Sequence, residues 1–410
     1  MTFTKNLASP LLPYPLVNIA MTQSSILQAK SLQSQIISQR RHFHQNPELS
    51  FNEIKTGSYL ADQFSQLGYK VTHPVAKTGL LADLLPQPKI AVRADMDALP
   101  IQEENDLTYK STTPNVMHAC GHDAHMAIAL ACANLLSQQK NLPVRFLLQP
   151  AEENSDKEGK SGAYRMIEAG ALANIQAIIG LHVDSTLKPG QVAIASGPVM
   201  AASDSFTLKI IGSGGHGAFP ESTIDAVVIQ AYIITQIQQI ISRKISAFEP
   251  GIITIGSVKS SSNAGNVISD YVEMKGTIRS FNKVTRDKLV KELDNVCKSA
   301  INLGGNYEIK YEFGYPATVN DKNIAQFMKE SAANIVGEEN VVECTPKLWS
   351  EDFSMYQELI PGAFMFLGAK ISDAPRCHHN PKFDIDESGL YYGAAILADT
   401  VIRLNEKFVR

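Results

Sequence analysis

Apolar residues recur along this chain with two periods, one helical and one typical of strands. Helical spacing predicts a helix over residues 26–42 and a second over 53–67. Beyond them, short apolar runs that fit strands alternate with helical segments. Strands are predicted at residues 79–85, 89–93, 144–148 and 177–181, and helices at 123–138 and in a segment ending near Gly170. This alternation indicates an α/β domain with a largely parallel sheet.

The pattern changes near residue 201 and changes back near residue 314. Between them we predict strands at 205–211, 252–257, 271–280 and 307–313, and helices at 224–242 and 286–303. This order of strands and helices is ferredoxin-like, so residues 201–314 should form an inserted α+β module. A helix at 324–336, a strand at 362–368 and a helix at 388–408 follow it. We therefore expect residues 21–200 and 315–410 to form one α/β domain.

Composition narrows the class of protein. Apolar residues make up 44% and charged residues 19% of the chain, and the net charge is −4. This balance gives no reason to expect nucleic acid or an anionic membrane as a partner, and a small substrate fits better. The five cysteines are odd in number and form no C-x-x-C pair. That usage predicts free thiols in a reducing compartment, most simply the cytoplasm.

The first twenty residues are a separate case. Pro10, Pro13 and Pro15 interrupt their apolar stretch, and no small-residue cleavage pattern is present, so a secretory signal is not favoured. Met21 offers an alternative start just ahead of the first helical pattern. We expect residues 1–20 to be an extension without fixed structure, and no other apolar run is long enough to span a bilayer.

Candidate chemistry begins with a dense cluster of histidines. Cys120 and His122 flank Gly121 at the start of the predicted helix 123–138. A thiolate and an imidazole held in one turn can converge on a zinc-like divalent ion. If Cys120 stood alone, a buried and inert cysteine would be the preferred interpretation.

Other candidate ligands follow the predicted strands. Glu152 and Glu153 come after one strand and His182 after the next, while His378 and His379 precede the final helix. Parallel strands bring their carboxyl ends to one edge of a sheet, where open α/β sheets bind ligands. Of two adjacent carboxylates, one can bind metal while the other accepts a proton from water, although a solvated loop explains the pair alone equally well. Four separate clusters of candidate ligands are all expected to meet at the same edge of the sheet, which favours a metal site over coincidence.

In this order, the motifs resemble the aminoacylase/carboxypeptidase clan of metallopeptidases, in its amidohydrolase branch with the hippurate hydrolases and auxin-conjugate hydrolases. The resemblance covers about residues 26–405. The matching stretches are residues 41–50, 93–100, 118–125, 150–153, 180–183, 214–218 and 350–353. The resemblance implies a two-metal exopeptidase-like catalytic domain with a mostly parallel central sheet. It also implies that the ferredoxin-like module is a lid and dimerisation domain.

The resemblance further assigns roles to single residues. It implies two divalent ions per subunit, zinc or manganese first, with cobalt or nickel as alternatives. The implied ligands are Cys120, His122, Glu153, His182 and His379. Glu152 would be the general base, and Asp97 would orient a neighbouring part of the site. Asp95 stands where other branches of the clan have a ligand histidine, so it is not counted as a ligand.

In the inserted module, the resemblance assigns three residues to the substrate. His216 matches a histidine that stabilises the oxyanion at the scissile carbonyl in a partner subunit, which implies a homodimer or a dimer-based oligomer. Asn266 and Arg279 match groups near the substrate carboxylate, and a forked guanidinium suits that task. Without the resemblance, Arg279 would be interpreted as a surface residue of a strand. Glu221, where relatives often have a histidine, is a departure that concerns substrate preference.

The sequence therefore predicts an enzyme that hydrolyses the amide bond of N-acyl amino acids or related small conjugates. A water activated by the metal ions is the expected nucleophile, with Glu152 as general base. A metallo-carboxypeptidase or dipeptidase with the same apparatus is an alternative, and a catalytically silent binding protein is another. Retention of Glu152 and of all five ligands argues against the silent protein, whereas only substrate assays separate the first two.

Overall fold

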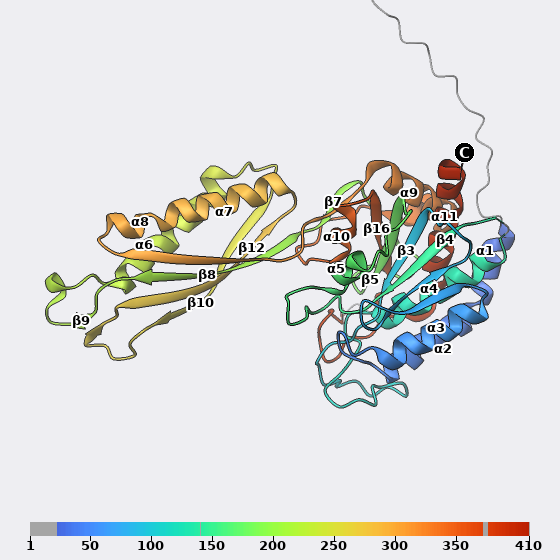
Figure 1. The fold of residues 1–410 in the computed structure, drawn as a ribbon, viewed down its shortest axis with the longest axis horizontal. Coiled ribbons are helices and arrows are strands. Elements are labelled where there is room, and N and C mark those ends of the chain that lie inside the picture. The colour runs from blue at the N-terminus through green and yellow to red at the C-terminus, as the bar shows by residue number, and fades with distance from the viewer. Residues whose placement is uncertain (1–22, 140, 372–375, 410) are drawn as a thin grey trace, which may run out of the picture.

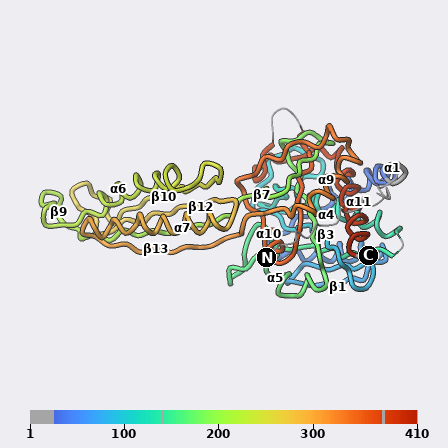
Figure 2. The backbone as a smooth tube through the Cα atoms, turned by 90° about the horizontal axis from the view of Figure 1, so that it is seen from above, coloured from blue at the N-terminus to red at the C-terminus, as the bar shows by residue number. Residues whose placement is uncertain are grey.

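The computed structural model describes residues 23–139, 141–371 and 376–409. The predicted extension, residues 1–20, lies outside these described residues. The chain forms two lobes, and long strands run from one lobe into the other (Figure 1). The second lobe is a narrow arm that points away from the first in both views (Figures 1 and 2).

The larger lobe is built on an eight-stranded sheet in the order β1-β2-β4-β3-β5-β16-β6-β15. Its strands are β1 (Lys70–Val75), β2 (Gly79–Asp83), β3 (Ile90–Asp95), β4 (Val144–Gln149), β5 (Ala177–Asp184), β6 (Val192–Ala193), β15 (Val341–Val342) and β16 (Gly362–Gly368). The four central strands, β4, β3, β5 and β16, pair in parallel, and β2 joins β4 in antiparallel orientation. The largely parallel sheet that the alternating pattern predicts is therefore present.

Helices cover both faces of this sheet. They are α1 (Gln23–Ser31), α2 (Gln33–Gln45), α3 (Ile54–Gln66), α4 (His122–Ser137), α5 (Gly162–Glu168), α9 (Lys322–Val336), α10 (Phe353–Gln357) and α11 (Leu390–Val409). Successive residues of β3 alternate between two apolar cores. Ile90 and Val92 pack in the core that holds α4 and α11, whereas Ala91 packs in the core that holds α5 and α10. Burial on both faces explains why the central strands read as continuous apolar runs.

The arm is a four-stranded antiparallel sheet in the order β10-β12-β8-β13. Its elements are β8 (Ala202–Ile211), α6 (Ala226–Gln239) with a π-helical turn (Ile240–Lys244), β10 (Gly251–Ser260), β12 (Tyr271–Ser280), α7 (Lys283–Cys297), α8 (Ser299–Asn302) and β13 (Asn306–Phe313). Buried and half-buried residues alternate along β8, because one face packs against α6 and α7. The order of elements along the chain agrees with the predicted one, while the assignment as a lid stays a prediction.

Two short ladders complete the fold. β7 (Gly197–Met200) pairs with β14 (Thr318–Asn320), and β9 (Gly215–His216) pairs with β11 (Val267–Ile268) at the far end of the arm (Figure 1). The five cysteines are free. No helix in the described part of the chain combines the length and the apolar character that crossing a membrane requires.

Candidate metal centre

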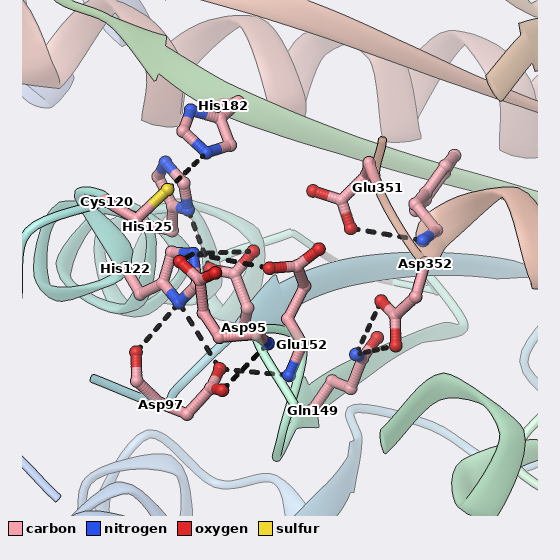
Figure 3. Close-up of polar contacts among 12 residues, drawn as sticks. Asp95, Asp97, Cys120, His122, His125, Gln149, Glu152, His182, Glu351 and Asp352 are labelled. Atoms are coloured by element: carbon pink, nitrogen blue, oxygen red, sulfur yellow. Dashed lines mark hydrogen bonds and ion pairs between the residues drawn. The ribbon is translucent and has the colours of Figure 1, made fainter. Parts of the chain in front are cut away.

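The carboxyl ends of three parallel strands meet at one edge of the large sheet. β3 leads into Asp97, β4 leads into Glu152 and Glu153, and β5 carries His182 near its end. Parallel pairing of β3 with both β4 and β5 makes the three ends point the same way. The helix α4 also begins there, and His122 is its first residue (Figure 3). Segments far apart in the sequence thus meet at a single site.

The turn before α4 presents two of the predicted ligands. Gly121 has a φ of 98°, and a Cβ at this position would lie 2.3 Å from Val183 Cγ2. Only glycine fits a left-handed turn this crowded. The turn at Gly121 lets Cys120 and His122, which flank it, face the same side of the chain. Cys120 Sγ lies 3.3 Å from Nε2 of His182.

The predicted ligands form overlapping groups of converging donor atoms. One ligand atom from each of Cys120, His122 and Glu153 lies within 4.8 Å of the others. Oε1 of Glu153 lies 4.0 Å from His122 Nε2 and 3.1 Å from His379 Nε2. Together with the contact between Cys120 and His182, these distances place all five predicted ligands in one site.

Hydrogen bonds determine which nitrogen of each histidine is free. His122 Nδ1 lies 2.8 Å from the carbonyl oxygen of Asp97, and His182 Nδ1 lies 2.7 Å from that of Val183. A ring nitrogen that donates to a carbonyl leaves the other nitrogen as an acceptor, which is the form that binds metals. His122 Nε2 is buried and has no hydrogen-bond partner in the described chain. An orphaned acceptor aimed at neighbouring ligand atoms fits a divalent ion.

Asp97 holds both glutamates in place. Its carboxylate accepts the backbone N–H groups of Glu152 and Glu153, each at 3.0 Å, and the hydroxyl of Ser50 at 2.6 Å. Its backbone carbonyl accepts from His122 as described. One residue therefore orients a ligand histidine and the adjacent glutamates, in agreement with the role that the resemblance implies.

Acidic groups outnumber basic ones in the buried part of the site. The buried guanidinium of Arg93 binds Asp95, Glu351 and Asp352. Burial, followed by the neighbouring carboxylate of Glu351, raises the pKa of Glu152 well above its usual value. Crowded buried carboxylates are costly unless cations balance them. Two divalent ions therefore fit the charge of the site as well as its donor atoms.

His125 lies beside the ligands, but both of its ring nitrogens are occupied. Nδ1 lies 2.7 Å from Asp95 Oδ1, and Nε2 accepts the backbone N–H of Val183 at 3.0 Å. The rings of His122, His125 and His182 are close enough to share an ion. Because a ligand nitrogen must present a free lone pair, His125 positions the end of β5 instead of binding metal.

Two residues outside the implied ligand set also line the site. His378 Nδ1 lies 3.1 Å from the carbonyl oxygen of Cys120, and its Nε2 has no hydrogen-bond partner in the described chain. Trp349 stacks against His182 with ring centroids 6.3 Å apart. The adjacent pair His378 and His379 is a sequence signal for the first of these residues, whereas no periodicity or spacing marks Trp349.

A cavity of about 490 Å³ opens onto the ligands and reaches the arm. Its wall includes Arg279 from β12 and Tyr315, whose hydroxyl donates to the carbonyl oxygen of Glu152 at 3.0 Å. Arg279 Nη1 donates to the carbonyl oxygen of Ile278 at 3.2 Å, and no carboxylate in the described chain forms an ion pair with this arginine. Its guanidinium can therefore receive an anionic group in the cavity.

The other two residues assigned to the substrate lie far from this cavity. His216 in β9 and Asn266, just before β11, are exposed at the far end of the arm (Figure 1). The N–H of Gly217 donates to the carbonyl oxygen of Asn266 at 2.8 Å, which keeps the two residues together. A single chain does not bring them to its own metal ligands.

Comparisons with known proteins agree over nearly the whole chain. IAA-amino acid hydrolase ILR1-like 4 of Arabidopsis thaliana is 37% identical over 380 residues, which cover 89% of this chain and 84% of the relative. Thermostable carboxypeptidase 2 of Saccharolobus solfataricus is 37% identical over 390 residues, which cover 92% of this chain and 97% of the relative.

A solved structure and a family model complete the comparison. The Bacillus subtilis YXEP protein, a dinuclear metal-binding peptidase from the M20 family, superposes with a TM-score of 0.80 and 32% identity. The match covers 92% of this chain and 99% of that one. The model of peptidase family M20/M25/M40 matches residues 91–403. The chain therefore belongs to peptidase family M20/M25/M40 and has its mixed α/β fold with a mostly parallel central sheet.

Proposed function

We propose that this chain is a metal-dependent amidohydrolase that cleaves the amide bond of N-acyl amino acids or related small amino-acid conjugates. One observation carries the proposal. Four of the five predicted ligands (Cys120, Glu153, His182 and His379), the carboxylate of Glu152 and the guanidinium of Arg279, which has no carboxylate partner in the described chain, all border the same cavity. Family membership and the hydrolase relatives support the same reaction class.

Five residues would hold the metal ions: Cys120, His122, Glu153, His182 and His379. Bound divalent ions supply Lewis acidity, which polarises an amide carbonyl and makes a coordinated water more acidic. Thiolate and imidazole ligands suit zinc, and manganese, cobalt or nickel are accommodated by similar donor sets. The dinuclear metal site of the YXEP protein supports a pair of ions.

Residues of the chain itself carry out the proton transfer and bind the substrate. Glu152 accepts a proton from the attacking water and later delivers it to the leaving nitrogen. Its backbone is held by Asp97 and by the hydroxyl of Tyr315, so its carboxylate keeps one position during the transfer. Arg279 binds the carboxylate of the amino-acid part through its forked donors.

In this proposal, residues 201–314 are a ferredoxin-like lid and dimerisation module. They are inserted into a catalytic domain of residues 21–200 and 315–410. His216 and Asn266 stand together at its exposed end, far from the cavity of their own chain. In a homodimer with a two-fold axis, each arm can bring these two residues to the metal centre of the partner. His216 would then donate to the oxyanion, and Asn266 would bind near the substrate carboxylate.

A metallo-carboxypeptidase acting on short peptides is the second candidate. The match to thermostable carboxypeptidase 2 favours it, and cleavage of a C-terminal peptide bond needs the same base and carboxylate site.

The five free cysteines support a reducing compartment for either enzyme, and we propose the cytoplasm.

A substrate panel with metal control tests this function. Protein loaded with zinc or manganese is incubated with N-acetyl, N-benzoyl and indole-acetyl amino acids and with dipeptides, and release of free amine is measured. We expect release from the acyl amino acids that a chelator abolishes and added metal restores. Faster cleavage of dipeptides would establish the carboxypeptidase instead, and no release from metal-loaded protein would refute both candidates for these substrates.

A further inference from the structure

Arg40 on α2 is among the largest side chains that are fully buried. Its guanidinium uses all three nitrogens to bind three carboxylates. Nε donates to Asp123 Oδ2 at 2.9 Å, Nη2 to Asp384 Oδ1 at 3.0 Å, and Nη1 to Glu387 Oε1 at 3.1 Å. The proposed reaction does not use any of these four residues.

The three carboxylates belong to two of the segments that carry ligands, one from each of the two parts of the chain that form the catalytic domain. Asp123 directly follows the ligand His122 at the start of α4. Asp384 and Glu387 follow the loop that carries His379. Arg40 therefore joins two ligand-bearing segments that are separated by most of the chain.

Asp123 is itself held from two sides. His44, one helical turn after Arg40 on α2, places its Nδ1 2.7 Å from the same Asp123 Oδ2, and its Nε2 lies 3.3 Å from Glu103 Oε1. The other oxygen, Oδ1, accepts the N–H of Ala124 at 2.9 Å. These hydrogen bonds fix the position of the Asp123 carboxylate and, with it, the first turn of α4.

The two segments also touch at the ligands. The N–H of His379 donates to the carbonyl oxygen of Ala119 at 2.8 Å, directly before Cys120. Behind this contact, Arg40 keeps the segments from separating. Direct hydrogen bonds and ion pairs within the chain therefore hold these two ligand-bearing segments together.

We propose that Arg40 is a positioning residue that preassembles the metal centre, so that its three-carboxylate clamp sets the affinity of the site for divalent ions. The inference rests on the metal centre of the proposed function. A clamped site spends little binding energy on ordering these two of its ligand-bearing segments, whereas a loosened site must order them when an ion binds. Lysine cannot substitute, because one ammonium nitrogen cannot reach three carboxylates in the planar geometry of a guanidinium.

The test is metal binding by the substrate-free protein. Wild-type protein and the Arg40→Lys variant are stripped with chelator and titrated with Zn²⁺ or Mn²⁺ by calorimetry. We expect the dissociation constant to rise about 10–100-fold in the variant. At saturating metal, KM for an N-acetyl amino acid should be unchanged, because Arg40 does not line the cavity.

Arg41→Lys is the matched control. Arg41 neighbours Arg40 and also binds Glu387, at 2.6 Å, but its side chain is 42% exposed and it makes no bond to Asp123. The control should change metal affinity by no more than about threefold, as expected for a partly exposed ion pair. An equal loss in both variants would show that replacing either arginine of α2 weakens metal binding, whether or not it binds Asp123, and would overturn the clamp.

Wild-type metal affinity in Arg40→Lys, even with a lowered melting temperature, would reduce Arg40 to a purely structural role and refute the proposal. If that variant does not fold, Asp384→Asn weakens the C-terminal side of the clamp and takes its place, with the same expectation and the same refuting result. Failure of the proposed function is separable, because an inactive wild-type protein that binds two ions still permits the comparison of affinities.

Discussion

The larger lobe and the arm place their candidate functional residues in opposite environments. In the larger lobe, Asp97, His122 and His182 are buried, and each is held by at least one hydrogen bond from another segment or from the backbone. In the arm, His216 and Asn266 are exposed on a short two-stranded ladder. Only Arg279, near the base of the arm, reaches the cavity.

This difference separates two requirements of catalysis. Metal ligation and proton transfer need fixed distances, and burial behind a sheet edge supplies them within one chain. In the proposed function, oxyanion and carboxylate recognition are divided between Arg279 of the same chain and residues that would come from a second copy. An altered ligand or base should therefore inactivate the site of its own chain, whereas His216 and Asn266 should be replaceable by those of another chain.

Glu152→Gln should produce the largest effect on turnover. The amide keeps the size of the side chain but cannot accept the proton, so kcat should fall about 10²–10⁴-fold while metal content stays unchanged. Glu153→Gln is the matched control, and we expect it to lose metal because it removes a ligand. Steady-state kinetics with metal analysis of both variants checks this division, and full activity of Glu152→Gln would remove it from the role of base.

His216→Ala should lower kcat about 10²–10³-fold if His216 donates to the oxyanion. Mixing this variant with Glu152→Gln tests whether it acts across subunits. After random exchange, half of the dimers are hybrids with one intact site of two, so activity should recover to about a quarter of the wild-type value. Activity of the mixture is measured beside exchange between differently tagged subunits, and exchange without recovery would confine each site to one chain.

Strong periodicity made the buried elements predictable. β12 and β16 have the bounds that the apolar pattern predicts, because each is a regular strand with a clear alternating or continuous apolar run. The predicted helix 26–42 is instead two helices, α1 and α2, that join at Leu32. Leu32 keeps a nearly helical backbone, with φ −81° and ψ −7°, so the spacing of apolar residues does not reveal the interruption. The apolar pattern does not reveal β1, because it is an edge strand that alternates exposed with half-buried residues and contains Pro74.

The residues of the site also differ in whether the sequence predicts them. Its ligands could be selected because histidine, cysteine and glutamate cluster at strand ends, and parallel strands bring such ends together. Arg40 and Trp349 could not be predicted, because their roles depend on contacts across the tertiary structure that leave no local pattern. In the sequence, Arg40 is one of several polar residues of a predicted helix, and only the tertiary structure shows that it binds Asp384.

Arg279→Lys should have the smallest effect and should appear in KM. Lysine keeps the charge but loses the forked donors, and a charge-assisted hydrogen bond contributes roughly 1.5–3 kcal/mol, so KM for an N-acyl amino acid should rise about 10–100-fold with little change in kcat. The same substrate with a carboxamide in place of its carboxylate is the control, and its KM should be nearly equal in wild type and variant. If the variant keeps the preference for the carboxylate, that group is recognised by other residues, and the exposed end of a partner's arm becomes the part of the molecule that must supply them.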